Sequence, residues 1–337
     1  MRIEEFCRNL IQISDTVYFL YNLFCATPVY KKIIAKKIKN RLEYLKNRNE
    51  IKFMIETTSV CNAKCVFCVY PTMKRKHAAM SDETFSTIVE RIKTEDITPL
   101  CFDLFMIGEP FLDKKIFERI RILKTTFPNA KVNITSNFSS VDKDVIDQLI
   151  ASKTDFVNIS LNASDGRKYK AVMGLDYEKT VENVKLLIAE RDRNKSDLRI
   201  GVSMVVYDDT SMKDVWKFFA KWAFKTDTLR FQRAATWGSK VKVKKLMSRM
   251  SFKNLYPCNE LFERFPILSN GDFALCCQDA EGIVKLNVHE TPVLTAWHSA
   301  VFEKMREINL GDELRSSDMC KDCFATNSNG ANWLFPH

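Results

Sequence analysis

The stretch CNAKCVFC at residues 61–68 closely follows an apolar run, Ile51 to Ile55, that is typical of a β-strand. Its cysteines, Cys61, Cys65 and Cys68, have the spacing C-x3-C-x2-C, so three thiols must share one inorganic partner. Iron–sulfur clusters are normally held by four cysteines. A triplet therefore leaves one corner of a cubane open, and an open position makes a metal site reactive. A zinc site with a distant fourth ligand is the alternative.

Strand-like and helix-like patterns alternate from residue 51 to about residue 235. Parallel strands joined by right-handed crossovers follow from this alternation. Six strands are too few to close an eight-stranded barrel. The sequence therefore predicts an α/β fold with a curved, partly open barrel, and it places the cysteine segment at the carboxyl ends of the strands. The predicted strands are 51–57, 101–106, 130–135, 155–161, 199–206 and 228–233, and the predicted helices are 81–94, 114–126, 141–152, 178–193 and 212–224.

Polar residues recur at the ends of the predicted strands. Gly108 permits close backbone approach to a ligand, and Glu109 can accept a hydrogen bond from an ammonium group. Ser136 and Asn137 end the third predicted strand, and Ser160 ends the fourth. Each of these polar residues could instead cap a helix. Their shared placement at one edge of the sheet favours a ligand site.

Arg233 ends the sixth predicted strand. If successive side chains of that strand point to opposite faces, Arg233 shares a face with Phe231. An arginine at the mouth of a barrel can hold a substrate hydroxyl or an anion, whereas a solvated surface position is the alternative interpretation. Arg233 is thus the candidate substrate-binding residue.

A second group of cysteines follows residue 250. Four thiolates would complete the coordination shell of a [4Fe–4S] cluster or of zinc, and spacing alone does not separate the two. Gly271-Asp272 joins residues 266–269 to residues 273–276 as a hairpin turn would, which predicts that Cys276 approaches Cys258. The spacing favours Cys276 over its neighbour Cys277. The predicted ligands are Cys258, Cys276, Cys320 and Cys323.

At the residue 61–68 segment the chain resembles the radical SAM superfamily. The resemblance includes Phe67 before the third cysteine, the approach Glu56-Thr57-Thr58 and the step Cys61-Asn62. It implies a partial (β/α)6 barrel over residues 50–235, whose three cysteines hold a [4Fe–4S] cluster that chelates S-adenosylmethionine (SAM). Reductive cleavage of SAM to a 5′-deoxyadenosyl radical would follow, with a flavodoxin or ferredoxin-type electron donor. The SAM contacts implied are Phe67, Gly108, Glu109, Ser136, Asn137 and Ser160, although Ile107 stands where the family has a glycine.

The C-terminal part is similar to the SPASM/Twitch extension of these enzymes, which implies one auxiliary [4Fe–4S] cluster. The cysteine spacing and Arg233 resemble those of superfamily dehydrogenases that oxidise amino-cyclitols. This implies oxidation of a hydroxylated small molecule, with Arg233 orienting the hydroxyl and the auxiliary cluster accepting an electron. The expected domains are a helical extension at residues 1–50, the barrel at 51–235, and a linker with the auxiliary-cluster domain at 236–337.

Other functions remain open at this point. Within the superfamily, peptide modification, epimerisation and methyl transfer are alternatives. From another class, a zinc or iron–sulfur protein could bind nucleic acid through residues 31–48, which hold eight lysines and arginines against one acid. The net charge of +10 is concentrated in that segment, so nucleic-acid binding is not expected.

The same basic segment suggests a place for membrane contact. As an amphipathic helix it could rest on an anionic membrane, as in an enzyme acting on lipid-linked sugars, or it could be a solvated capping helix. The apolar run at residues 17–29 is too short to span a bilayer. Eleven cysteines without a signal-peptide pattern indicate reduced thiols, and we expect a cytoplasmic protein. Four scattered histidines argue against a zinc hydrolase.

Overall fold

The fold was analysed in a computed structural model of the chain, which describes residues 49–242, 258–310, 316–321 and 323 together with scattered residues between 9 and 40. Apart from those scattered residues, residue 49 and residue 50, the helical extension predicted for residues 1–50 falls outside the described residues, as do residues 243–257 of the predicted linker and auxiliary-cluster domain.

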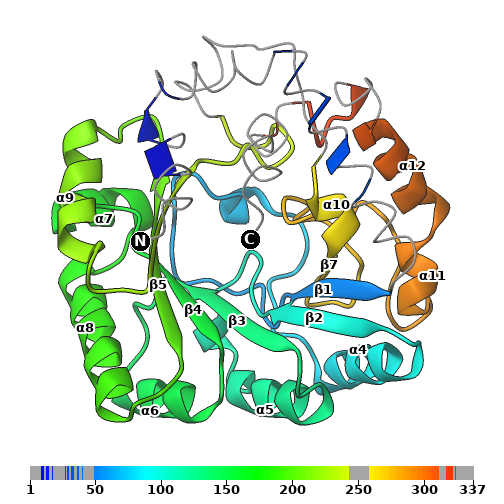
Figure 1. The fold of residues 1–337 in the computed structure, drawn as a ribbon, viewed down its shortest axis with the longest axis horizontal. Coiled ribbons are helices and arrows are strands. Elements are labelled where there is room, and N and C mark those ends of the chain that lie inside the picture. The colour runs from blue at the N-terminus through cyan, green and yellow to red at the C-terminus, as the bar shows by residue number, and fades with distance from the viewer. Residues whose placement is uncertain are drawn as a thin grey trace.

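A curved seven-stranded sheet forms the centre of the molecule (Figure 1), in the order β6-β5-β4-β3-β2-β1-β7 with every neighbouring pair parallel. All six predicted strands are present, so the open α/β barrel is confirmed. Because β6 and β7 stand at the two ends of the sheet, the described strands do not close a barrel. The strands are β1 Glu50–Ile55, β2 Thr98–Asp103, β3 Lys131–Ser136, β4 Phe156–Ser160, β5 Arg199–Val206, β6 Thr228–Arg233 and β7 Arg264–Ile267.

Strand β7 was not predicted as part of the barrel. The prediction that Gly271-Asp272 joins residues 266–269 to residues 273–276 as a hairpin turn is confirmed, since the Ala274 N–H donates to the Pro266 carbonyl (3.0 Å). Gly271 has the positive φ of +86° that favours glycine, and Ile267 forms an antiparallel bridge with Phe273. Residues 264–267 also pair with β1, more than 200 residues earlier. The C-terminal part of the chain thus adds the seventh strand.

Helices cover the convex side of the sheet (Figure 1). The sheet surface that points toward these helices is apolar. The rings of Phe53 and Phe102 stack with their centroids 5.8 Å apart, and the Phe102 ring centroid lies 5.3 Å from that of Phe127 at the end of α5. The helices are α4 Asp82–Thr94, α5 Ile116–Thr126, α6 Lys143–Ala151, α7 Gly166–Met173, α8 Tyr177–Arg193, α9 Met212–Trp222, α10 Glu260–Glu263, α11 Val293–Trp297 and α12 Ala300–Leu310.

The inner face of the sheet is polar. The Asn133 amide donates to the Asp103 carboxylate (2.9 Å), and the Asn158 amide donates to Ser203 Oγ (3.0 Å). Buried polar groups on this face are therefore paired with one another across neighbouring strands. The five predicted helices are present as α4, α5, α6, α8 and α9, whereas α7 was missed.

Side-chain caps explain where most of these helices begin. Asp165 and Ser211, for example, accept hydrogen bonds from the backbone N–H three residues later, at the starts of α7 and α9. At α9 the N3 residue Asp214 also accepts from the backbone N–H of Ser211, which completes a capping box. These caps hold the helix starts near the carboxyl ends of the strands.

The outer edge of β6 is met by the N-terminal part of the chain. Asn9 is buried; its amide donates to the Leu229 carbonyl (2.8 Å), and its Oδ1 accepts from the Phe231 N–H (2.9 Å). Ile13 packs against the core. Residues of the predicted extension therefore reach the barrel edge.

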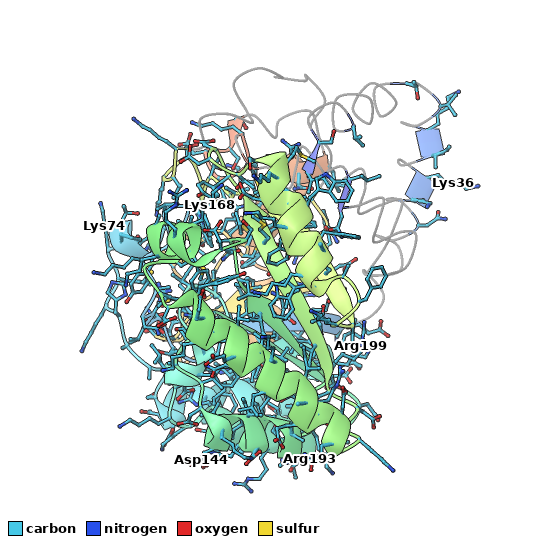
Figure 2. The ribbon with its side chains drawn as sticks, turned by 90° about the vertical axis from the view of Figure 1, so that its left-hand side faces the viewer. Lys36, Lys74, Asp144, Lys168, Arg193 and Arg199 are labelled. Atoms are coloured by element: carbon cyan, nitrogen blue, oxygen red, sulfur yellow. The ribbon has the colours of Figure 1, made fainter. Side chains whose placement is uncertain are left out.

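Figure 2 separates the two ends of the barrel. Lys74 and Lys168, which follow strands, lie on one side, whereas Arg199, the first residue of β5, lies on the opposite side. The exposed Lys36 lies on the Arg199 side, away from Lys74. Among the described residues no helix combines the length and apolarity needed to cross a bilayer.

Candidate active site at the carboxyl ends of the strands

The cysteine loop follows β1 and is fixed by α7. The backbone N–H of Lys64 donates to the Met173 carbonyl (2.8 Å), and that of Val66 donates to the Val172 carbonyl (3.0 Å). Both carbonyls belong to the last turn of α7, where helix carbonyls have no partner within the helix. Helix α7, which was not predicted, thus fixes the backbone of the cysteine loop at residues 61–68.

The three thiols of this loop are half-buried. Burial raises the pKa of Cys61 to about 11 and that of Cys65 further, with the neighbouring thiols Cys68 and Cys61 adding to the shift at Cys65. Backbone N–H groups of Ala63 and Tyr70 point at the sulfurs of Cys61 (3.5 Å) and Cys68 (3.4 Å). A bound metal reverses such a pKa shift, because coordination deprotonates the thiol.

Within the described ranges, no three His, Cys, Asp or Glu side chains converge as the ligands of a single metal ion do. In a cubane each thiolate binds a different iron, so a cluster needs thiols that are close but not convergent. Three half-buried cysteines in one loop, with N–H groups directed at sulfur, fit a [4Fe–4S] cluster with one open iron.

Gly108 is required by a close backbone contact. A Cβ at this position would lie 2.0 Å from the carbonyl oxygen of Thr58. The next residue, Glu109, donates its backbone N–H to the Val60 carbonyl (2.8 Å). The segment after β2 is therefore docked against the segment that leads into the cysteine loop, which only glycine permits.

The Glu109 side chain lies at the centre of a buried network. Its Oε1 accepts from Ser136 Oγ (2.6 Å) and from the Phe111 N–H (3.2 Å), and its Oε2 accepts from the Asn137 N–H (2.7 Å). Burial raises the pKa of Glu109 to about 7, although these hydrogen bonds oppose the shift. Each carboxylate oxygen has two acceptor positions, so Oε2 can take one more donor such as a ligand amino group.

Asn137 connects this network to the cysteine loop. Its side-chain amide donates to Asn62 Oδ1 (2.8 Å), and the Asn62 amide donates to Ser139 Oγ (3.0 Å). The predicted residues Ser136 and Asn137 are therefore brought together with Glu109. Their visible contacts are with the protein, which gives them a positioning role. Ser139 was not predicted as a site residue, and Asn62 was predicted only as part of the cysteine motif.

Ser160 ends β4 beside Ser203 of β5. In the part of the chain that the structure describes, no hydrogen bond is seen that links it to the Glu109 network. Its assignment as a SAM contact stays a prediction.

Arg233 is buried and shares a face of β6 with Phe231, as predicted. The Phe231 ring packs at 5.6 Å on Phe218 of α9, so this face begins on the helix side of the sheet. Arg230 and Gln232 occupy the inner face, next to the β5 residues with which they are in register. Arg233 can therefore reach the interior only over the carboxyl end of its strand.

A cavity of about 250 Å³ opens next to the cysteine loop. The rings of Phe67 and Tyr207 meet there at 6.0 Å between centroids. Two carboxylates, Asp208 and Asp209, line the cavity in the turn after β5, and Lys242 adds a cation. The acidic turn was missed, because its sequence is also that of an ordinary surface turn.

The second set of cysteines lies in the C-terminal part. Cys258, Cys320 and Cys323 are buried. Burial also raises the pKa of both Cys276 and Cys277, and each is within electrostatic reach of Cys323. Desolvated thiols drawn from separate segments suit an iron–sulfur cluster. Which of the adjacent pair binds iron stays a prediction.

A buried ion pair joins the C-terminal part to the barrel. Glu56, just after β1, pairs with Arg75 at 2.5 Å and also accepts from the Ser269 N–H (3.0 Å). Glu281 accepts from the backbone N–H groups of Lys74 (2.9 Å) and Arg75 (3.2 Å). An acid directly after a strand was the available signal for Glu56, whereas nothing local marked Arg75 as its partner.

Comparison with known proteins identifies both parts. Residues 55–220 match the Radical SAM superfamily, and residues 258–324 match the SPASM iron–sulfur cluster-binding domain. The GTP 3′,8-cyclase of Chlorobaculum tepidum is 29% identical over 125 residues, and a probable GTP 3′,8-cyclase of Saccharolobus islandicus is 28% identical over 135 residues. These alignments cover 36% and 40% of this chain, and 36% and 42% of the relatives' own lengths.

Solved structures share the fold at low identity. BtrN in complex with AdoMet and 2-DOIA aligns with a TM-score of 0.54 at 17% identity, over 82% of this chain and 92% of that one. SuiB of Streptococcus suis bound to precursor peptide SuiA gives 0.62 at 17%, over 82% and 71%. Native anSMEcpe with bound AdoMet gives 0.59 at 17%, over 85% and 97%. The domains imply SAM, a SAM-binding [4Fe–4S] cluster and an auxiliary iron–sulfur centre as cofactors.

Proposed function

We propose that this chain, a radical SAM enzyme with a SPASM domain, is an oxidoreductase that removes hydrogen from a hydroxylated small molecule of the sugar or amino-cyclitol type. The observation that carries the proposal is the presence of two sets of unbridged, buried or half-buried cysteines, one in the loop after β1 and one in the C-terminal part. Oxidation of an alcohol needs an acceptor for one electron after hydrogen abstraction, and a second cluster can serve as that acceptor.

When bound, SAM and its cluster would supply a 5′-deoxyadenosyl radical for hydrogen abstraction, and the auxiliary cluster would supply an acceptor for one electron from the substrate. Cys61, Cys65 and Cys68 would hold the first cluster. Cys258, Cys276, Cys320 and Cys323 would hold the second.

The chain's own residues would orient SAM. Glu109 would accept a hydrogen bond from the amino group of SAM, and Ser136 and Asn137 donate to the Glu109 carboxylate and keep it in place. Phe67 and Ser160 complete the contacts we propose. Gly108 allows the Glu109 segment to lie against the cysteine loop.

Substrate binding is assigned to the cavity beside Phe67. Asp208 and Asp209 would attract an amino group and accept hydrogen bonds from hydroxyls. Arg233 would orient the reacting hydroxyl from the end of β6. A guanidinium stays charged at normal pH, so Arg233 acts as a hydrogen-bond donor and water takes the proton.

Relatives support a small-molecule substrate without deciding it. The cysteine spacing resembles that of 2-deoxy-scyllo-inosamine dehydrogenase, and BtrN, crystallised with 2-DOIA, shares the fold. Arg233-Ala234-Ala235 departs from the Arg-Gly-Gly expected of that dehydrogenase. The same proposal includes a flavodoxin or ferredoxin-type electron donor and a cytoplasmic location. It also includes the predicted domain boundaries and membrane contact through residues 1–50.

Peptide modification is the second candidate. SuiB with its precursor peptide and anSMEcpe with a Cp18Cys peptide have the same fold. The cyclase relatives match less than half of this chain, and epimerisation or methyl transfer would need the same radical but no net electron acceptor.

The test is anaerobic reconstitution followed by iron and sulfide analysis and assay with dithionite and SAM. About eight irons are expected, falling to about four in a Cys61→Ala/Cys65→Ala/Cys68→Ala variant, with 5′-deoxyadenosine formation lost in that variant. Amino-cyclitols, sugars and peptides are then screened, each deuterated at the candidate carbon.

Deuterium in 5′-deoxyadenosine with a ketone product, one per SAM consumed, supports the oxidoreductase. Deuterium transfer from a peptide favours the second candidate. Zinc in place of iron, or no SAM cleavage at full iron content, contradicts both.

A further inference from the structure

We infer that Gln278 and Trp237 form a bridge between the two groups of cysteines, in which Gln278 raises the reduction potential of the auxiliary cluster through a hydrogen bond to Cys323. The Gln278 side-chain amide donates to Cys323 Sγ at 3.1 Å. The inference rests on the proposed function in one respect, that Cys323 is a cluster ligand.

The orientation of the Gln278 amide is dictated by Trp237. The Trp237 backbone N–H donates to Gln278 Oε1 at 3.0 Å. Because a backbone N–H can only donate, the oxygen of the amide must face Trp237 and the NH2 group must face the sulfur. Gln278 is buried, so neither group can exchange its partner freely with water.

Trp237 also contacts the first cysteine loop. Its indole N–H donates to the carbonyl oxygen of Phe67 at 3.1 Å, and this carbonyl belongs to the peptide bond that leads into Cys68. A continuous path therefore runs from Cys323 through Gln278 and Trp237 to the Cys68 peptide.

The backbone at Trp237 supports a special role. Trp237, Gly238 and Ser239 have consecutive positive φ angles of +53°, +64° and +64°. A bulky residue in this region is an outlier that persists only where its surroundings determine it. Here a Cβ on Gly238 would lie 3.1 Å from Met319 Sδ, next to Cys320, so the turn fits tightly against the C-terminal cysteine segment.

Ile107 belongs to the same arrangement. It packs with Val69, Met73 and Ala280 in a small apolar cluster that Trp237 joins. The departure from glycine at this position thus supplies apolar contact where the cysteine loop and the C-terminal part meet.

A hydrogen bond to a cluster sulfur stabilises the reduced, more negative state and so raises the potential. Removing the Gln278 donor should lower the affinity of the auxiliary cluster for an electron by up to about tenfold, which is 59 mV for a one-electron couple. Gln278→Leu removes both bridge contacts. Gln278→Glu keeps the acceptor for Trp237 and removes the N–H donor.

The experiment is a redox titration of each reconstituted protein, followed by electron paramagnetic resonance, with iron content measured in parallel. Gln148→Leu on the exposed surface of α6 is the matched control. We expect a lower auxiliary potential in both Gln278 variants and no change in Gln148→Leu. If Gln278→Leu does not retain iron, the comparison is decided by Gln278→Glu.

Trp237→Phe separates the two ends of the bridge. It removes the indole N–H but keeps the backbone N–H to Gln278, so the auxiliary potential should stay as in wild type while the SAM-binding cluster loses iron faster to a chelator. An unchanged potential in Gln278→Glu at full iron content overturns the inference. A wild-type protein without a second cluster fails in the iron count instead, which identifies failure of the proposed function.

Discussion

The two groups of cysteines differ in how they are assembled. Cys61, Cys65 and Cys68 lie within one loop after β1, whereas the second group spans residues 258–323 and depends on the segments between them. The first group is encoded locally but held by distant contacts with α7 and the Glu109 segment. The difference teaches that a recognisable motif and a stable site are separate properties.

The largest effect is expected where the local motif depends on a distant residue. Gly108→Ala places a Cβ 2.0 Å from the Thr58 carbonyl, so backbone must move. We expect a loss of about 3 kcal/mol in unfolding free energy and near-complete loss of 5′-deoxyadenosine formation. Urea denaturation and the SAM cleavage assay measure these two quantities.

Gly166→Ala is the matched control, because its Cβ would meet only the flexible Glu178 carboxylate at 3.3 Å. It should leave stability and activity close to wild type. Wild-type activity in Gly108→Ala would show that the cysteine loop does not need this contact.

The next prediction concerns the dispersed group. Cys276→Ala should reduce iron from about eight to about four per chain, with 5′-deoxyadenosine still formed because the first loop is intact. Cys277→Ala should keep its iron. Iron analysis decides between the adjacent cysteines, and the reverse result would assign the ligand to Cys277.

Glu109 is the residue we propose to connect the buried network to SAM. Its substitution should affect function less than the glycine and cysteine substitutions above. Glu109→Gln removes a charged acceptor, worth about 1.5–3 kcal/mol, so the Kd for SAM should rise roughly tenfold to a hundredfold. Glu90→Gln on the exposed face of α4 serves as control. Equilibrium binding by isothermal titration measures the change.

The same titration can be repeated at several pH values to measure how SAM affinity depends on pH. Burial raises the pKa of Glu109 from 4.5 to about 7, so its carboxylate is neutral below that pH and ionised above it. An amino group donates to the ionised form, so SAM affinity should increase as the pH rises through about 7. This dependence should vanish in Glu109→Gln; if it persists there, another group is titrating.

The smallest effect is expected at Asn62. Asn62→Ala removes its hydrogen bonds with Asn137 and Ser139, each worth about 1 kcal/mol. Iron of the first cluster should then be lost several-fold faster to a chelator, and iron of the second cluster should be unaffected. Asn194→Ala, which removes a bond of 2.7 Å to the Glu190 carbonyl far from the site, should change neither rate.

Much of the barrel could be predicted because its signals are local. The apolar run at 51–55 and the polar ends at Ser136 and Ser160 lie within single strands. Strand β7 could not be predicted as part of the barrel, since it has four residues and its partner lies in β1. Helix α7 has eight residues, too few for a clear apolar period.

The residues of the site also separate into those marked by local sequence and those that depend on distant contacts. Spacing alone identified the cysteine triplet, and Glu109 was recognised from its own short motif. The bridge of Gln278 and Trp237 joins residues 41 positions apart through one hydrogen bond, and the Glu56–Arg75 pair reaches Ser269. Such contacts depend on folded geometry and leave no periodicity in the sequence.

Asn9 has a consequence for strand pairing between copies of this chain. The side-chain amide of asparagine carries the same donor and acceptor as a peptide group, so Asn9 occupies at Leu229 and Phe231 the positions that a neighbouring strand would use. An exposed strand edge is a template for pairing with another chain, and an occupied edge is not. In the folded molecule, the Leu229 carbonyl and the Phe231 N–H are therefore not available to pair with a strand of another chain.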